Sequence, residues 1–247
     1  MKKFFRFLLV LILIVGGCAA YFFLANNKMM VGVLKSDKDA LLTTLNNSIK
    51  KVHDYGNFNF SYQSENKTTK TKQTSQVLIK FDGENRYFSA EVTNIAGNDT
   101  KNYSYYCEAK GDVATLYEKS GDEKKKFVTT WDLALDKVMD YRVANNMILA
   151  NDYTCQKEDF DKYFKSSKVT FCFKPFYYGA QIEIEGAGEN SKFDISNRGI
   201  LRKIELSGKS AVFGELSVSL TVNKPGKAVS INSLSDTAKD EYKLSII

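Results

Sequence analysis

The chain contains the stretch Glu215-Leu-Ser-Val-Ser-Leu-Thr-Val222, in which polar and apolar side chains alternate at every position. Successive side chains of an extended strand point to opposite faces, so this alternation predicts a β-strand with one buried face and one wetted face. Pro225 and Gly226 follow it and predict its end. Sheets that bury only one face are typical of antiparallel proteins.

The same two-residue period recurs along most of the chain. Short turns such as Asp82-Gly83 and Gly121-Asp122 join consecutive segments, which predicts hairpins and therefore an antiparallel meander. We expect roughly nine to eleven strands, and a sheet of that width must curl into a partly open barrel, or half-barrel. The further segments with this pattern are 57–62, 77–81, 88–92, 103–107, 113–117, 127–128, 169–173, 182–184, 193–195 and 200–206.

Two regions have helical spacing instead. Residues 41–52 place apolar side chains on one helical face, with Ser36 and Asp39 as a predicted capping box and Gly56 as the predicted stop. A second helical region, near 130–165, interrupts the strands as an insertion. The predicted fold class is therefore α+β and predominantly antiparallel β: a curled meander sheet whose concave side is filled by an N-terminal helix and a central helical insertion.

The N-terminus has the features of a membrane segment. Lys2, Lys3 and Arg6 precede an uncharged, apolar run over residues 7–25, which is long enough to span a bilayer. Because positive flanks stay on the cytoplasmic side, the rest of the chain is expected to face outward from the cell membrane. The predicted organisation is an anchor at 1–25, a short tether at 26–35, one extracytoplasmic domain at 36–226 and a C-terminal tail at 227–247.

Cys18 leaves two kinds of anchor open. The run Val15-Gly16-Gly17-Cys18 resembles the lipobox of bacterial lipoproteins, in which the cysteine is lipidated after cleavage just before it. The alternative is an uncleaved transmembrane signal anchor in which Cys18 is a buried thiol. Both alternatives tether the domain to the membrane.

Three cysteines follow the anchor. Cys155 and Cys172 would close a short loop if they formed a disulfide outside the cell. The alternative is that these two and Cys107 are reduced thiols packed as small apolar side chains. No Cys or His spacing matches a zinc site, so we expect neither a metal nor a cofactor.

Charge and motifs exclude several functions. The formal net charge of +6 falls to +3 without Lys2, Lys3 and Arg6, which is too small to indicate nucleic-acid binding. The sequence has no GxSxG, Walker, HExxH or SxxK motif, and no pattern links a nucleophile to its single histidine, His53. We therefore expect no enzymatic activity.

Aromatic residues are abundant, with 14 Tyr and 17 Phe. Many of them occupy predicted inward positions of strands. They either form a packed core or line a cavity for an apolar ligand between the sheet and the helices. The candidates for such a lining are Phe58, Phe60, Phe81, Phe171, Phe173 and Phe193.

The order of elements, from apolar N-terminus through helix, meander, helical insertion and second meander, resembles that of the LolA/LppX-like half-barrel proteins of bacterial envelopes, which include uncharacterised lipoproteins of low-GC bacteria. The resemblance implies an unclosed barrel lined by apolar and aromatic side chains, used in that superfamily to hold acyl chains. The expected function is thus a membrane-tethered, lipoprotein-like domain that binds a hydrophobic or lipidic ligand. The alternative is a non-catalytic structural or adhesion module that contacts other envelope components. The sequence predicts no particular oligomeric state.

Overall fold

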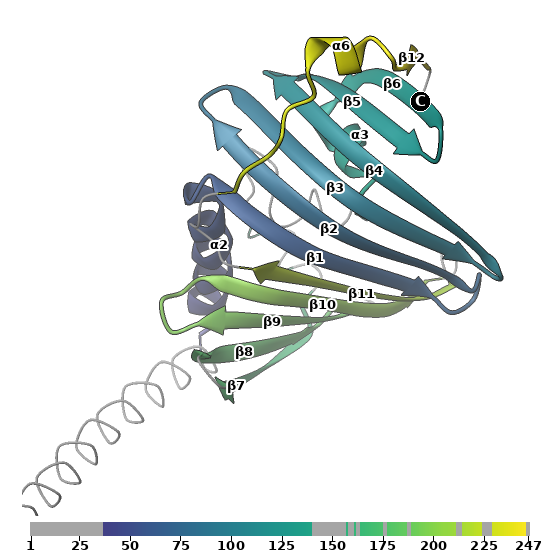
Figure 1. Ribbon diagram of the computed structural model, residues 1–247. Coiled ribbons are helices and arrows are strands. Elements are labelled where there is room, and N and C mark those ends of the chain that lie inside the picture. Colours follow the sequence, from purple (N-terminus) through teal and green to yellow (C-terminus); the bar gives the residue numbers. More distant parts are fainter. Residues whose placement is uncertain are drawn as a thin grey trace, which may run out of the picture.

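The computed structural model describes residues 37–139, 157, 161, 164–174, 177–186, 189–210, 214–223 and 229–245. Its strands form one 12-stranded sheet in the order β12-β6-β5-β4-β3-β2-β1-β11-β10-β9-β8-β7 (Figure 1). Every neighbouring pair is antiparallel except β12 and β6, which are parallel. The strands are β1 (Asn57–Asn66), β2 (Thr71–Asp82), β3 (Asn85–Ala96), β4 (Asp99–Lys110), β5 (Val113–Ser120), β6 (Glu123–Thr130), β7 (Ser166–Lys174), β8 (Tyr177–Glu185), β9 (Glu189–Ser196), β10 (Leu201–Ser210), β11 (Gly214–Asn223) and β12 (Lys243–Leu244).

The predicted antiparallel meander is confirmed, and it consists of two parts. Strands β1 to β6 follow one another by hairpins, and β7 to β11 do the same. The two parts join where β1 pairs with β11, for example at Phe60 and Val222. Figure 1 shows the joined sheet strongly twisted, with α2 (Lys38–Asp54) against one of its faces. We call that face inner and the opposite face outer.

Helix α2 begins one turn before its first buried leucine. The Asp37 carboxylate accepts a hydrogen bond from the Ala40 amide at 3.0 Å, so Asp37 provides the N-terminal cap. The predicted capping residue Ser36 lies outside the described residues. Gly56 adopts a positive φ of 64° just beyond the helix, as its predicted role as the stop requires. The apolar stripe of α2 is buried against the sheet through Leu41, Leu42, Leu45, Ile49 and Val52.

Inward side chains of both meanders form one continuous core. The register explains this continuity, because it aligns inward residues of adjacent strands in rows. One row runs from Tyr62 through Leu220 and Ile204 to Phe193. Helix α2 packs on β10, and α3 (Trp131–Leu135) packs on β5 and β6. The inner face is thus apolar on both sides of the β1–β11 junction.

The predicted helical insertion begins where expected. Thr130 caps α3 by accepting a hydrogen bond from the Leu133 amide at 3.4 Å. The carbonyls that follow α3 are satisfied by β2: Gln73 donates to the Lys137 carbonyl at 3.2 Å, and Ser75 donates to the Val138 carbonyl at 2.5 Å. Most of the predicted insertion near 130–165 lies outside the described residues.

The C-terminal segment packs on the outer face of the first meander, which sequence analysis did not predict. Lys239, in α6 (Asp236–Lys239), pairs with Glu108 at 2.9 Å, and the Tyr242 ring meets the Tyr117 ring edge-on at 5.3 Å. Strand β12 then pairs with the edge strand β6. Figure 1 shows this segment crossing the sheet towards that edge. It covers backbone groups of β6 that would otherwise be unpaired.

None of the helices in the described part of the chain is both long enough and apolar enough to cross a membrane. The predicted anchor at 1–25, with Cys18, lies outside that part.

Candidate functional site

Three of the predicted cavity residues come together on the inner face. Phe58 and Phe60, both fully buried on β1, have ring centroids 5.0 Å apart. Phe81 at the end of β2 lies 5.7 Å from Phe58 and is partly buried. Phe193 is also buried, but it lies on β9 in the other meander. The inner face therefore gathers the first three into one cluster and leaves Phe193 apart from them.

The remaining predicted site residues cannot be placed in the same way. Phe171, Cys172 and Phe173 lie on β7, but their side chains are outside the described residues, as is the whole of Cys155. The predicted Cys155–Cys172 disulfide therefore stays a prediction. Cys107 is described as a free, fully buried thiol on the inner face.

Two residues that sequence analysis left out of the site complete the cluster. The Trp131 ring lies 5.4 Å from that of Phe88 and 6.2 Å from that of Phe81. Trp131 is the only tryptophan of the chain and is 2% exposed. We call Phe58, Phe60, Phe81, Phe88 and Trp131 the aromatic wall. The signal available in the sequence was the single tryptophan at the start of the predicted helical insertion.

The aromatic wall carries one unsatisfied polar group. The Trp131 indole Nε1–H is buried and has no hydrogen-bond acceptor among the described residues. Buried polar groups are nearly always paired, and an orphan costs about 1–3 kcal/mol. The Arg86 guanidinium lies 5.8 Å from the Trp131 ring centroid and makes no ion pair with any described residue. The Trp131 indole N–H and the Arg86 guanidinium thus lie beside an otherwise apolar cluster.

The Cys107 thiol and the Tyr105 hydroxyl on the inner face are held in their neutral forms. Burial raises the pKa of the Cys107 thiol well above its ordinary value, and the Glu108 carboxylate adds to the effect. Burial and the nearby Glu118 raise the pKa of Tyr105 in the same direction. A thiol that stays protonated is a poor nucleophile and a poor metal ligand. Among the described residues, no group of His, Cys, Asp and Glu is arranged to hold a metal ion.

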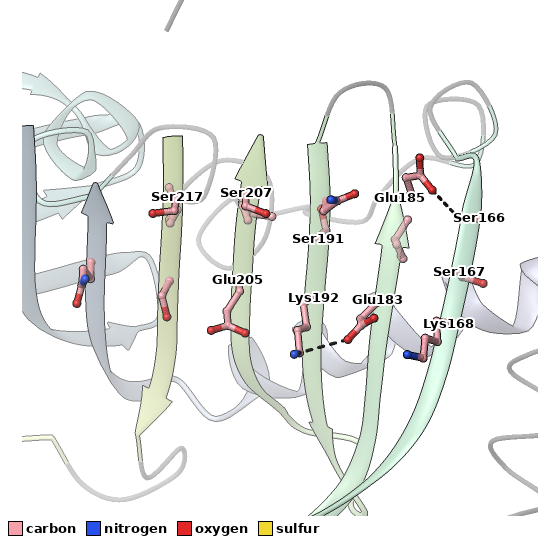
Figure 2. Close-up of a pocket in the computed structure, with 16 residues that line it drawn as sticks. Ser166, Ser167, Lys168, Glu183, Glu185, Ser191, Lys192, Glu205, Ser207 and Ser217 are labelled. Atoms are coloured by element: carbon pink, nitrogen blue, oxygen red, sulfur yellow. Dashed lines mark hydrogen bonds and ion pairs between the residues drawn. The ribbon is translucent and has the colours of Figure 1, made fainter. Parts of the chain in front are cut away.

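A second feature lies on the outer face of β1, β11, β10, β9, β8 and β7. It is an open depression of about 620 Å³ in which polar side chains from neighbouring strands stand in rows across the sheet (Figure 2). The strand register defines two of these rows. The charged row consists of Gln63, Ser219, Glu205, Lys192, Glu183 and Lys168, and the hydroxyl row consists of Ser217, Ser207, Asn190, Glu185 and Ser166.

The depression continues beyond the hydroxyl row into a second hollow of about 470 Å³. Four residues of the hydroxyl row line both hollows, which makes them one feature that we call the outer groove. A third row, the rim row, bounds its far side with Lys67, Glu215, Lys209 and Lys165. The hydroxyl row forms the floor of the outer groove because three of its side chains are short serines, whereas long charged side chains stand in the rows on both sides of it.

Two ion pairs join charged residues of the outer groove. Lys192 lies 3.6 Å from Glu183, and Lys67 lies 2.5 Å from Glu215. The hydrogen bond from Lys67 holds the pKa of the Glu215 carboxyl below its ordinary value. Ser166 donates to Glu185 at 3.1 Å, as Figure 2 shows. The groove therefore presents both signs of charge in alternation, and none of the predicted cavity residues with a described side chain lines it.

Comparison with known proteins gives matches among solved structures. No family model and no curated protein matches the chain. Among solved structures, the chain is similar to LprF from Mycobacterium bovis, with 11% sequence identity and a TM-score of 0.47 over 78% of this chain and 95% of the LprF chain.

Proposed function

We propose that this chain is a membrane-tethered, outward-facing, non-catalytic binding protein whose half-barrel holds a lipidic ligand between the sheet and the inner helices. The observation that carries the proposal is the buried indole N–H of Trp131, which has no acceptor among the described residues and lies beside Phe81 and Phe88 of the aromatic wall. Ligand sites are typically apolar surfaces with a few placed polar groups that fix orientation. The aromatic wall has that composition.

The neighbours of Trp131 specify the ligand further. A carboxylate or ester oxygen would accept the indole hydrogen bond and remove the cost of the orphan group. Arg86, which has no described ion-pair partner, stands close enough to pair with an anionic head group. The acyl chain would then lie along Phe58, Phe81 and Phe88. These features favour a fatty acid or another acyl lipid with an acidic head.

The tether follows from the sequence rather than from the described residues. The apolar run at 1–25 would hold the domain at the outer side of the cell membrane, either through a lipid on Cys18 or as a transmembrane helix. A lipid-binding half-barrel at that place would be within reach of membrane lipids.

Mass spectrometry of bound lipid tests the proposal. The full chain is purified from host membranes, exchanged into a lipid-free detergent, and extracted with organic solvent. We expect about one mole of acyl lipid per mole of wild-type chain. The Trp131→Phe variant, which keeps an aromatic ring but loses the N–H donor, should retain several-fold less.

Tyr242→Phe is the matched control, because Tyr242 packs on the outer face and loses only a polar group. It should retain the wild-type amount of lipid. Equal retention by the wild type and Trp131→Phe, or no lipid in the wild type, would overturn the proposal.

A second candidate function is a structural or adhesion module that contacts other envelope components. The outer groove favours it, since this polar depression faces away from the apolar inner face. A lipid-free wild type would leave this candidate as the better one.

A further inference from the structure

We infer that the outer groove binds a neutral polysaccharide strand. This inference does not depend on lipid binding, because the groove lies on the opposite face of the sheet from the aromatic wall.

The shape of the outer groove suits a chain rather than a single small molecule. Its charged row crosses six neighbouring strands and its hydroxyl row crosses five, and the five interstrand steps of the charged row, at about 4.8 Å each, give a length of about 24 Å. The charged row and the hydroxyl row are two residues apart along each strand, which is about 7 Å. The groove is therefore long, narrow and open to solvent along its length.

The lining of the groove suits hydroxyl groups. Serine hydroxyls both donate and accept hydrogen bonds, Asn190 and Gln63 do the same through their amides, and the glutamates accept only. A sugar ring carries several hydroxyls that donate and accept in turn. An acyl chain would gain little, because it would desolvate Lys and Glu side chains without pairing them.

The charge pattern excludes strongly charged polymers. The three rows contain five lysines and four glutamates, which are Lys67, Lys165, Lys168, Lys192, Lys209, Glu183, Glu185, Glu205 and Glu215. Along the charged row the signs alternate from Glu205 to Lys168. A polyanion or a polycation would thus meet a like charge at every second strand, at a cost in binding. A neutral polymer meets no such penalty.

Saturation-transfer NMR with chitohexaose and maltohexaose, two neutral hexasaccharides, tests the inference on the full chain in detergent micelles. We expect saturable binding of at least one of them by the wild type. The Ser207→Tyr variant places a ring on the middle of the hydroxyl row and should raise the Kd at least tenfold. Ser207 is exposed, so the substitution leaves the core untouched.

Ser89→Tyr is the matched control, since it makes the same change on β3, outside both hollows of the groove. It should bind as the wild type does, and circular dichroism should show the same fold for all three proteins. No saturable binding of either sugar by the wild type would overturn the inference, as would binding that survives Ser207→Tyr. Preferential binding of hexaglutamate or hexalysine would also overturn it and would indicate a site for charged peptides.

Discussion

Replacement of Ser75 by alanine should destabilise the fold and loosen the support of Trp131. Ser75 is 2% exposed on the inner face of β2 and donates to the Val138 carbonyl at 2.5 Å. That carbonyl follows α3, where helix geometry leaves carbonyls without an internal partner. The hydrogen bond therefore fixes the end of the segment whose first residue is Trp131.

The expected cost follows from what the substitution leaves behind. Only one oxygen is removed, so the loss of packing is small. The Val138 carbonyl, however, remains buried without its donor, and such an orphan costs about 1–3 kcal/mol. With a urea dependence of about 2 kcal/mol per molar, the unfolding midpoint should fall by roughly 0.5–1.5 M.

Urea unfolding followed by tryptophan fluorescence measures this change directly. Trp131 is the only tryptophan, so the emission reports on the aromatic wall itself. Ser89→Ala, on the same sheet but not among the buried residues, is the control and should stay within about 0.5 kcal/mol of the wild type. A Ser75→Ala midpoint equal to that of the control would refute the claim that β2 anchors the segment after α3.

Three further predictions concern other parts of the molecule. Phe60→Ala, at a fully buried position of β1, should cost about 3–5 kcal/mol of unfolding free energy in the same urea assay. Val128→Ala, at a position that is 60% exposed, should change the unfolding free energy by less than about 0.5 kcal/mol. A small effect of Phe60→Ala would contradict the proposed core. Burial, followed in size by the Glu108 carboxylate, raises the pKa of Tyr117 from 10.0 to about 12. The protonated Tyr117 hydroxyl therefore contributes its full stabilisation below pH 10, and this stabilisation is lost as pH rises from 10 towards 12. Urea midpoints measured across that range should fall less steeply for Tyr117→Phe than for the wild type, and parallel curves would argue against this role. Metabolic labelling with a clickable palmitate analogue should mark the wild type but not Cys18→Ala if the lipobox is used, and an unlabelled wild type would leave the transmembrane anchor.

The strands and their inward faces could be predicted from the sequence because they depend on local alternation. The pattern from Glu215 to Val222 specifies which side chains point inward, and the structure buries Val218, Leu220 and Val222 as expected. Hairpin turns likewise specify which strands pair within each meander. These are properties of neighbours in the chain.

Pairing between distant strands could not be predicted in this way. Phe60 lies opposite Val222, and periodicity gives the face of each residue but not its partner. The outer groove arises for the same reason: Ser217, Ser207 and Asn190 form a row only because the register of three strands aligns them. The groove therefore becomes visible only once the pairings are known.

The packing of the C-terminal segment depends on single side chains. Glu108 accepts from Tyr106 and Tyr117 and pairs with Lys239, which lies 131 residues further along the chain. No periodicity marks such a contact, so the polar segment after residue 227 was predicted only as a tail. The surroundings of the Trp131 indole, which has no acceptor among the described residues, could not be predicted either, because they come from β2 and β3.

Fluorescence quenching by a brominated fatty acid tests lipid binding beside Trp131 most directly. Bromine quenches only on contact, so 9,10-dibromostearate should quench Trp131 in the full chain saturably, and unlabelled stearate should restore the emission. In the Tyr242→Trp variant, which keeps Trp131 and its indole N–H, the second tryptophan stands on the outer face, and the same additions should quench only the Trp131 part of the emission. Equal quenching at both positions, or none at Trp131, would contradict a ligand held against the aromatic wall.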